Sequence, residues 1–390
     1  MEKPVPITEI DKLTALLAEE RMKLQPVADK YAFRANDYYL SLIDWTDPQD
    51  PIRKLVVPGE GELKEYGRWD ASDEDGNYVV PGCQHKYGTT ALLVVSEVCA
   101  AYCRYCFRKR LFQQEVHEAT ANPEPGIAYI AAHPEISNVL LTGGDSLILS
   151  TSRLKNILGR LRDIPHVKIV RLGSKMPVFQ PMRIYEDEEL LQAIRDYSTS
   201  EQRIYVMAHV DHPRELTAEA RRAFQALMDA GAIVMNQTPI LRGINDDPKV
   251  LAELLDRLSW DGIAPYYFFI NRPVAGNSEF ILPLAKVYRI VEEAKARTSG
   301  LGKRVRLVMS HSSGKIEILA IEEGKAYLKY HQSRDGHYGK VMILDCPPGA
   351  SWFDDLPGSE RHWVSPHGKH RFAMSGPSAG KARPSSRTLF

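Results

Sequence analysis

Short hydrophobic runs recur through the middle of the chain, separated by longer segments with helical periodicity. Seven runs rich in Val, Ile, Leu, Tyr and Phe predict strands at 90–98, 138–142, 167–172, 203–208, 232–235, 265–270 and 305–310. They lack strict polar–apolar alternation, which is typical of strands buried on both faces. Alternation of strands and helices at a spacing of about 30 residues predicts a parallel sheet with helical crossovers, either a barrel or a doubly wound sheet.

Two of the segments between the strands have clear helix boundaries. In the segment 212–232 one apolar stripe lies between a candidate N-cap, Thr217, and Gly231, which follows the helix end. The segment 246–262 has Pro248 in its first turn and ends before a glycine. Both segments are therefore predicted to be crossover helices.

The two ends of the chain differ from this middle part. Residues 1–85 predict a helical N-terminal extension, with helices at 8–24 and 35–45 and a polar, loop-like stretch at 69–82. Residues 86–320 form the predicted core, and 321–374 a C-terminal segment with hairpin strands around a glycine turn. The tail 375–390, rich in Ser, Gly, Pro and basic residues, is expected to be disordered.

Composition excludes several classes of protein. Fifty acidic residues balance fifty basic ones among 390, so no global field recruits nucleic acid or an anionic membrane. No apolar run approaches the roughly 18 residues of a membrane span, and the first ten residues do not resemble a signal peptide. We therefore expect a cytoplasmic protein, and the odd count of five cysteines argues against a disulfide framework.

Three of the five cysteines are clustered. Cys99, Cys103 and Cys106 form a C-x3-C-x2-C pattern at the end of the first predicted strand. A structural zinc site needs four ligands, and His85 could complete one, which is an alternative interpretation. Three thiolates without a fourth fit better a [4Fe–4S] cluster in which one iron stays open to bind a small molecule.

This pattern, with the aromatic Tyr105 before the last cysteine, resembles the radical S-adenosylmethionine (radical SAM) superfamily. The segments "CAAYCRYCFRKR", "NVLLTGGDSLILS" and "PYYFFI" follow in order the pattern of the lysine 2,3-aminomutase family, and the resemblance covers roughly residues 35–320. It implies an α/β fold with a partial (β/α) barrel as its radical SAM core. The cluster and the substrate would then lie at the carboxyl ends of the strands, where such folds build their sites.

The resemblance assigns binding roles to particular residues. Those implied to contact SAM are Tyr105, Gly143, Gly144, Asp145, Ser174, His209 and Gln237. Two glycines let a backbone approach a ligand, and a carboxylate pairs with the methionine ammonium. A tight turn after a strand is the alternative interpretation of the Gly-Gly-Asp sequence. Arg108 stands where the family holds the substrate carboxylate, although a solvated basic surface is an alternative there.

A second cofactor is implied by the same resemblance. Moving an amino group between adjacent carbons by radical chemistry requires a π-system, which pyridoxal phosphate (PLP) supplies when it is bound to a lysine. Lys315 in "SHSSGKIEI" stands at the family's lysine position, and Tyr87 at a tyrosine that accompanies the cofactor. The family's phosphate-binding arginine falls on Thr90, so Lys86 or another cation would have to replace it.

The substrate positions differ from those of a lysine-specific enzyme. Asn271 replaces one of two aspartates that hold the distal ammonium, and the other falls near Val308 or Met309. A dry pocket without a counter-charge rejects an ammonium by several kcal/mol. Arg272 raises the alternative of an acidic substrate side chain, and lone Cys346 predicts no C-terminal zinc site.

The sequence thus predicts a radical SAM isomerase that performs a PLP-dependent 1,2-amino shift on an α-amino acid, with Lys315 as the catalytic lysine. The reduced cluster would cleave SAM to a hydrogen-abstracting radical. Expected partners are a small amino acid, an electron donor such as flavodoxin or ferredoxin, and a second copy of the chain in a homo-oligomer. Two alternatives remain: a PLP-independent radical SAM enzyme acting on another small molecule or a protein lysine, and a non-catalytic metal-binding scaffold.

Overall fold

The computed structural model describes residues 4–113, 118–119, 122–334 and 336–362. One mixed sheet dominates it, with the strand order β14-β13-β12-β11-β10-β9-β8-β7-β6-β5-β4-β3. Neighbouring strands from β5 to β11 are parallel, whereas β3, β4, β12, β13 and β14 pair antiparallel at the two edges. Within the described residues the two edge strands, β3 and β14, do not pair with each other, so the sheet is an open partial barrel, as predicted.

The strands of the sheet are β3 (Tyr78–Val80), β4 (Cys83–Tyr87), β5 (Thr90–Ser96), β6 (Asn138–Gly143), β7 (Ile169–Ser174), β8 (Arg203–Ala208), β9 (Ile233–Ile240), β10 (Ala264–Ile270), β11 (Arg306–His311), β12 (Gly314–Glu322), β13 (Lys325–Ser333) and β14 (Val341–Asp345). A separate antiparallel pair joins β1 (Pro6–Ile7) to β2 (Ala35–Asn36).

The helices are α1 (Ala18–Lys30), α2 (Asp37–Leu40), α3 (Pro51–Val56), α4 (Glu124–Ala132), α5 (Thr151–Arg162), α6 (Met176–Phe179), α7 (Met182–Tyr185), α8 (Glu188–Tyr197), α9 (Ala218–Asp229), α10 (Pro248–Trp260) and α11 (Leu284–Arg297). Among the described residues no helix has the length and apolar character needed to cross a bilayer.

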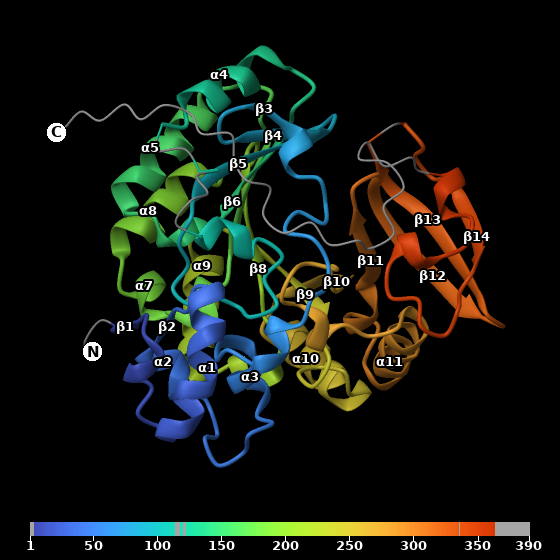
Figure 1. Cartoon of the computed structure of the whole chain (residues 1–390). Helices are drawn as coiled ribbons and strands as arrows, with labels where there is room; N and C mark the ends of the chain where they lie inside the picture. Colours follow the sequence, from blue (N-terminus) through green and yellow to red (C-terminus); the bar gives the residue numbers. More distant parts are fainter. Residues whose placement is uncertain (1–3, 114–117, 120–121, 335, 363–390) are drawn as a thin grey trace, which may run out of the picture.

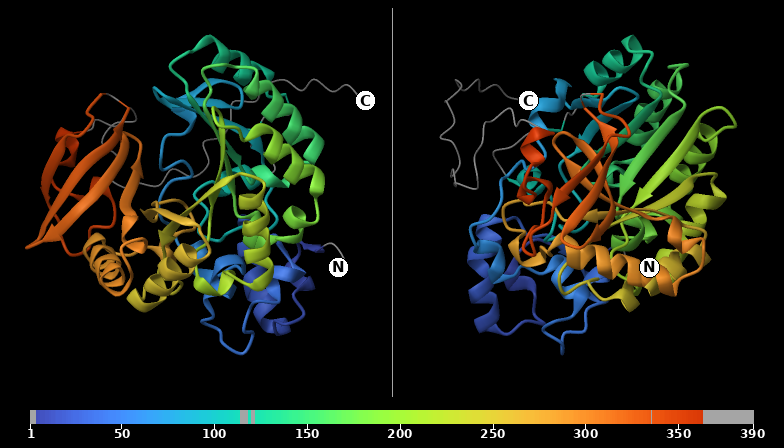
Figure 2. Two further views of the ribbon diagram at one scale, coloured as in Figure 1. Left: turned by 180° about the vertical axis from the view of Figure 1, so that it is seen from behind. Right: turned by 90° about the vertical axis from the view of Figure 1, so that its right-hand side faces the viewer.

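The long helices cover one face of the curved sheet and leave its other face for the site. Figure 1 shows α4, α5 and α8 along the outside of the strands, and the view from behind in Figure 2 shows the same layer. The other face curves around the interior between β5 and the antiparallel strands β12–β14. Because strands β5–β11 run in one direction, the loops after them share one rim of the sheet.

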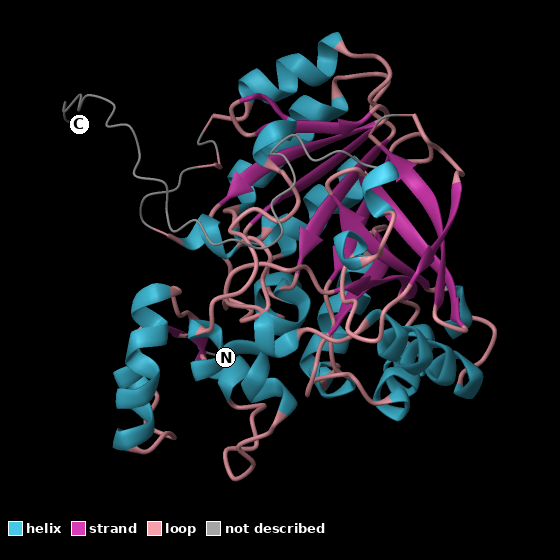
Figure 3. Cartoon of the chain, turned by 45° about the vertical axis from the view of Figure 1, so that its right-hand side comes forward, coloured by secondary structure: helices cyan, strands magenta, loops and turns pink. Residues whose placement is uncertain are grey.

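The N-terminal extension packs against this rim. Asn36 donates from Nδ2 to the carbonyl of Phe179, after β7, at 2.9 Å, and Tyr39 donates to Glu215, after β8, at 2.6 Å. Figure 3 shows the extension's helices beneath the open sheet. The extension therefore helps to shape the rim where the site was predicted.

The predicted strands and crossover helices are confirmed. All seven predicted runs are strands within a few residues, Thr217 caps α9 by accepting from the amide of Ala220, and Pro248 opens α10. The hairpin after residue 320 is present as β13 and β14. The tail 375–390 lies outside the described residues.

Three predictions need correction. The predicted helix at 35–45 is only α2, Asp37–Leu40, because Ala35 and Asn36 pair with β1 as a strand and Asn36 then caps the helix. The predicted helix at 8–24 begins only at Ala18, because Ile10, Leu13 and Leu16 are buried at a spacing of three residues, which a tighter helical turn accommodates better. The predicted loop around Lys315 is the beginning of β12, which forms a hairpin with β11. Lys315 therefore lies on a strand, in register with Ser310 on β11 and with Gln332 on β13.

Candidate active site

The three clustered cysteines lie on the loop between β5 and the short 3-10 helix Lys109–Phe112. The extension fixes this loop through backbone hydrogen bonds. The amide of Tyr102 donates to the carbonyl of Arg34, and the amide of Arg104 to the carbonyl of Leu55, each at 2.8 Å. The cysteine loop is thus positioned by strand β5 on one side and by the extension on the other.

A buried carboxylate of the extension, Glu62, binds two cations of the cysteine loop. Arg104 donates to it from Nε and Nη2 at 2.9 and 2.8 Å, and Lys109 from Nζ at 2.8 Å. Burial lowers the pKa of Lys109 to about 8, although Glu62 opposes this shift. Both cations are thus paired with the same carboxylate inside the protein, and pairing is the condition under which buried charges are tolerated.

A second carboxylate of the extension, Glu74, fills the same role for Arg108 and Arg110. Arg108 contacts it from Nε at 3.1 Å and from Nη2 at 2.7 Å, and donates from Nη1 to Thr142 at 2.8 Å. Arg110 donates to Glu74 at 2.6 Å and also pairs with Glu118. Burial alone would raise the pKa of Glu74, but the two arginines hold it well below its usual range.

Arg108 therefore has its side-chain donors engaged within the protein. The resemblance placed the substrate carboxylate on Arg108, and that role stays a prediction. In this arrangement a substrate would have to take the place of Glu74.

The chemistry of the three thiols fits an iron–sulfur cluster. Burial raises the pKa of all three, and Asp145 and the other two cysteines raise that of Cys99 further, so bound cations are needed to stabilise three thiolates together. Among the described residues no three His, Cys, Asp or Glu side chains converge on a single metal ion. In a [4Fe–4S] cluster each thiolate binds a different iron, so no such convergence is required.

The alternative zinc ligand, His85, has other partners. Its ring nitrogens contact the hydroxyl of Tyr129 at 3.0 Å and the carbonyl of Gly88 at 3.1 Å. The structure therefore gives no support to a site of three cysteines and this histidine.

The glycines of the Gly-Gly-Asp sequence allow a close approach of two loops. A Cβ on Gly143, whose φ is +120°, would lie 2.2 Å from the carbonyl oxygen of Ser96, and one on Gly144 would lie 2.3 Å from that of Val98. Asp145 is buried, and its carboxylate accepts from the amides of Leu147, Lys175 and Met176. This accounts for the motif as a structural turn, and its contact with SAM stays a prediction.

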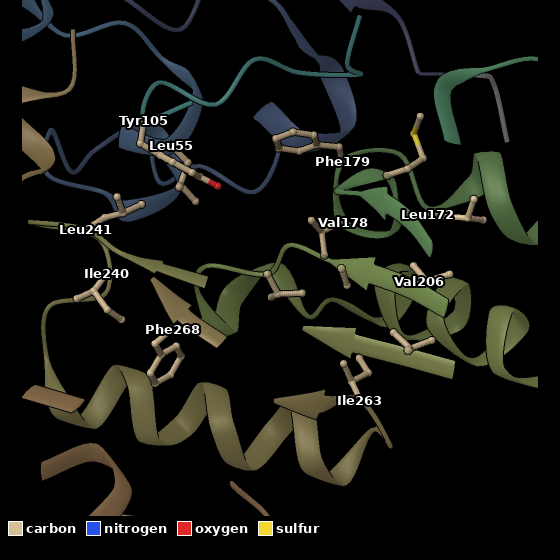
Figure 4. Close-up of a cluster of buried hydrophobic side chains, with 14 of the residues drawn as sticks. Leu55, Tyr105, Leu172, Val178, Phe179, Val206, Ile240, Leu241, Ile263 and Phe268 are labelled. Carbon is tan, nitrogen blue, oxygen red and sulfur yellow. The ribbon is translucent and has the colours of Figure 1, made fainter. Parts of the chain in front are cut away.

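Tyr105 takes part in a buried polar network beneath the cysteine loop. Its hydroxyl donates to Asp211, and Lys175 binds both Asp211 at 2.6 Å and Glu215 at 2.7 Å. Figure 4 shows Tyr105 near Leu55 of the extension, among buried side chains of the strands. The network ties the cysteine loop to the loops after β7 and β8.

The remaining residues predicted to contact SAM lie along the same rim or on the inner face. Ser174 ends β7 and accepts from the amide of Met176 at 2.9 Å. His209 follows β8, and burial together with the nearby Lys175 lowers its pKa to about 3, so its ring is neutral. Gln237 on β9 is in register with Tyr267 on β10, which puts both on the face that also carries Lys315.

Lys315 has an unusual environment for a lysine. Its Nζ lies 4.2 Å from the ring centroid of Tyr267 and 5.5 Å from that of Phe269. Burial, with added repulsion from Arg171, Arg272 and Lys86, lowers its pKa to about 7. No ion pair to Lys315 forms within the described part of the chain, so a large fraction of the amine is neutral near pH 7.

Around Lys315 lie polar groups with few partners. Lys86 on β4 donates to the carbonyl of His311 at 2.7 Å, and burial, followed by repulsion from Arg272, lowers its pKa to about 8. Beyond β10, Asn271 Nδ2 and Arg272 Nη1 are buried and have no hydrogen-bond partner. Tyr87, also on β4, lies within the electrostatic influence of Arg272. The structure thus brings the predicted PLP residues, Lys315 and Tyr87, to one region with Asn271.

Comparison with known proteins gives this arrangement a context. No family model matches the chain. It is 47% identical over 351 residues to a putative L-lysine 2,3-aminomutase of Aquifex aeolicus, covering 90% of this chain and 94% of that protein. It is also 36% identical to the L-lysine 2,3-aminomutase of Clostridium subterminale, covering 75% and 70% of the two chains. The chain belongs to the lysine 2,3-aminomutase family. A glutamate 2,3-aminomutase of Clostridioides difficile is 34% identical, covering 79% of this chain and 73% of the relative.

Membership of this radical SAM family makes the protein an enzyme of the isomerase class. The family implies a [4Fe–4S] cluster, SAM and a small amino acid as substrate. The three half-buried thiols on one loop fit the cluster.

Several residues of the site escaped the sequence analysis. Glu62, Glu74, Lys175 and Asp211 belong to no motif, and each contacts partners at least 30 residues away in the chain. A charge in a segment that also contains buried apolar residues was the available signal, but it does not identify the partner.

Proposed function

We propose that this aminomutase performs a PLP-dependent 1,2-amino shift and that Lys315 is the lysine that holds the cofactor. The observation that carries the proposal is the position of the Lys315 amine over the ring of Tyr267, without an acidic partner among the described residues, where burial and nearby cations lower its pKa to about 7. A lysine becomes a nucleophile toward a carbonyl when its pKa is depressed in this way. An ordinary surface lysine would be protonated near pH 7.

The proposed roles divide between the two sides of the inner face. Cys99, Cys103 and Cys106 hold the cluster, and Gly143, Gly144 and Asp145 shape the SAM site beside it. When bound, cluster and SAM supply hydrogen abstraction and PLP supplies a π-system for the migrating nitrogen. The side chains of Tyr105, Ser174, His209 and Gln237 orient SAM, and the neutral ring of His209 can both donate and accept a hydrogen bond.

The charge of the site favours an amino acid without a distal cation. Val308 and Met309 are fully buried and apolar, and Asn271 is neutral. A lysine ammonium brought into this region would be desolvated without a carboxylate partner. We infer that the substrate has a neutral or acidic side chain, and the glutamate 2,3-aminomutase among the relatives supports the second option.

The PLP assignment can be tested by spectroscopy. PLP titrated into the purified enzyme should produce a pyridoxal absorbance band, and borohydride reduction should leave the label on the peptide that contains Lys315. Lys315→Ala should abolish both signals. Lys325→Ala, which removes an exposed lysine of β13, should retain both.

The outcome that contradicts PLP dependence is equally clear. A wild-type protein that forms 5′-deoxyadenosine from SAM but binds no PLP would be a PLP-independent radical SAM enzyme.

Substrate class is tested by incubating the reduced enzyme with L-lysine, L-glutamate or L-alanine. A β-amino product from lysine alone would contradict the inference that the substrate has a neutral or acidic side chain.

A further inference from the structure

Two arginines flank the ring of Phe107, the residue that follows the third cysteine. The guanidinium of Arg108 lies 4.8 Å from the ring centroid and that of Arg272 lies 3.7 Å from it. Each of the three guanidinium nitrogens of Arg108 has a partner, either Glu74 or Thr142. Arg272 makes no side-chain hydrogen bond or ion pair within the described residues, and its Nη1 is buried. The two side chains therefore differ in their capacity to bind a ligand.

A buried guanidinium donor without an acceptor is costly. Leaving such a group unpaired costs several times the net value of an ordinary hydrogen bond, so native structures normally satisfy it. The Nδ2 donor of the adjacent Asn271 is also buried without a partner. Two neighbouring orphaned donors define a place for an acceptor that the chain itself does not supply.

The loop after β10 holds Arg272 in position without engaging its guanidinium. The amide of Arg68 donates to the carbonyl of Pro273 at 3.1 Å, and the amide of Val274 donates to the carbonyl of Arg272 at 2.8 Å. Gly67 permits this contact, because a Cβ there would lie 2.2 Å from the carbonyl oxygen of Pro273. The side chain is thus fixed by its backbone and by Phe107, with its hydrogen-bond donors free.

The charge around Arg272 indicates which acceptor fits. Its positive charge acts on Lys315, Lys86 and Tyr87, so it lies in the same region as all three. Glu74 also acts on Arg272, but it forms no ion pair with it and is itself bound by Arg108 and Arg110. No ion pair to Lys86, Arg171 or Arg272 forms within the described part of the chain. A dianion would match this group of cations better than a single carboxylate would. Arginine is suited to it because its planar fork binds phosphate through two parallel hydrogen bonds.

We propose that Arg272 is an oxyanion anchor of the site, assisted by Asn271, and that the oxyanion it binds is the phosphate of PLP. This inference rests on the proposed function, because it names a residue that would hold the cofactor assigned there. Arg108 belongs instead to the ion pairs that fix the cysteine loop.

The test compares PLP with pyridoxal, which lacks the phosphate. The cluster-loaded enzyme is titrated with each compound, and the dissociation constants are measured by difference absorbance. Arg272→Met should weaken PLP about 10- to 100-fold, as expected for the loss of a charge-assisted hydrogen bond, and leave pyridoxal unchanged. Arg272→Lys should lie between Arg272→Met and the wild type. Arg304→Met, a matched change at an exposed arginine, should alter neither constant.

Two results would overturn the assignment. Equal weakening of PLP and pyridoxal would mean that Arg272 acts only through packing. Unchanged binding of PLP with a raised KM for the amino acid would mean that the oxyanion bound by Arg272 is the substrate carboxylate. Should Arg272→Met fail to fold, as judged by its unfolding temperature, Arg272→Gln provides a polar replacement. Absence of PLP binding by the wild type would instead refute the proposed function.

Discussion

The cysteine loop and the surroundings of Lys315 are the two parts of the proposed site, and they differ in their electrostatics. On the cysteine side Arg104, Lys109, Arg108 and Arg110 are all paired with carboxylates, chiefly Glu62 and Glu74. On the lysine side Lys315, Lys86, Arg171 and Arg272 form no ion pair within the described residues. Both regions are rich in cations, but only those of the cysteine side form ion pairs with carboxylates; the charge of Glu74 reaches Arg272 and Lys86 without an ion pair.

This difference separates framework from binding site. Cations that the chain neutralises itself contribute to a fixed geometry, because each guanidinium is held by several hydrogen bonds. Cations that the chain leaves unpaired lower one another's pKa and raise the gain from binding an anion. The clustering of basic residues therefore carries little information about ligand binding until their partners are known.

The largest expected effect is the loss of the cluster from the cysteine side. Cys103→Ala removes one of three iron ligands, so the purified protein should lose its iron and sulfide, and 5′-deoxyadenosine formation should fall to background. The measurement is elemental analysis together with product quantification under reducing, oxygen-free conditions. Cys346→Ala, at a buried cysteine outside the loop, should keep the cluster. A Cys103→Ala protein with a full cluster would show that the loop is not its site.

The next effect concerns the paired charges themselves. Glu62→Gln leaves Arg104 and Lys109 buried without a carboxylate and should destabilise the protein by about 3–5 kcal/mol. Chemical denaturation of the cluster-free protein measures the change in the free energy of unfolding. Glu65→Gln, at an exposed position of the same segment, should change it by less than about 0.5 kcal/mol. Similar values for the two variants would mean that the cysteine side does not depend on its internal ion pairs.

The smallest effect is a pH dependence on the lysine side. Because the pKa of Lys315 is lowered to about 7, its reactive neutral form increases as pH rises through 7. Labelling by an amine-selective reagent, followed by mass spectrometry, should be about tenfold slower at pH 6 than on the plateau above pH 8. Lys325 provides the contrast, since its hydrogen bond and ion pair with Asp345 raise its pKa and should leave it poorly reactive throughout this range. Equal pH profiles for both lysines would contradict the lowered pKa of Lys315 relative to that of Lys325.

The parallel strands could be predicted from the sequence because burial on both faces leaves a local signature. Runs such as 138–142 and 203–208 are rich in Val, Ile, Leu and Met, and their boundaries in the structure differ little from those expected. Strand β12 was missed, although Ile316 and Ile318 alternate with Lys315 and Glu317. Ser312, Ser313 and Gly314 indicated a loop, but only the two serines form the turn between β11 and β12, and Gly314 already begins the strand.

Residues of the candidate site could be predicted where they belong to a motif with fixed spacing. Residues whose contacts are distant in the chain could not. The cysteines, the Gly-Gly-Asp sequence and Lys315 lie in recognisable local patterns. Glu74 lies in a polar segment that resembles a surface loop, yet it is buried in the structure. Its partners there, Arg108 and Arg110, are 34 and 36 residues away in the chain. Such pairing depends on the path of the backbone, which local composition does not specify.

The continuous sheet has one further consequence. The cysteine loop leaves β5 and Lys315 lies on β12, so seven strand-to-strand steps of hydrogen-bonded backbone separate the two. The curvature of that sheet sets the distance between the place where a hydrogen atom would be removed and the place where the nitrogen would be held. Substitutions that flatten or tighten the bend, even far from either end, should therefore alter how well the two halves of the reaction are aligned.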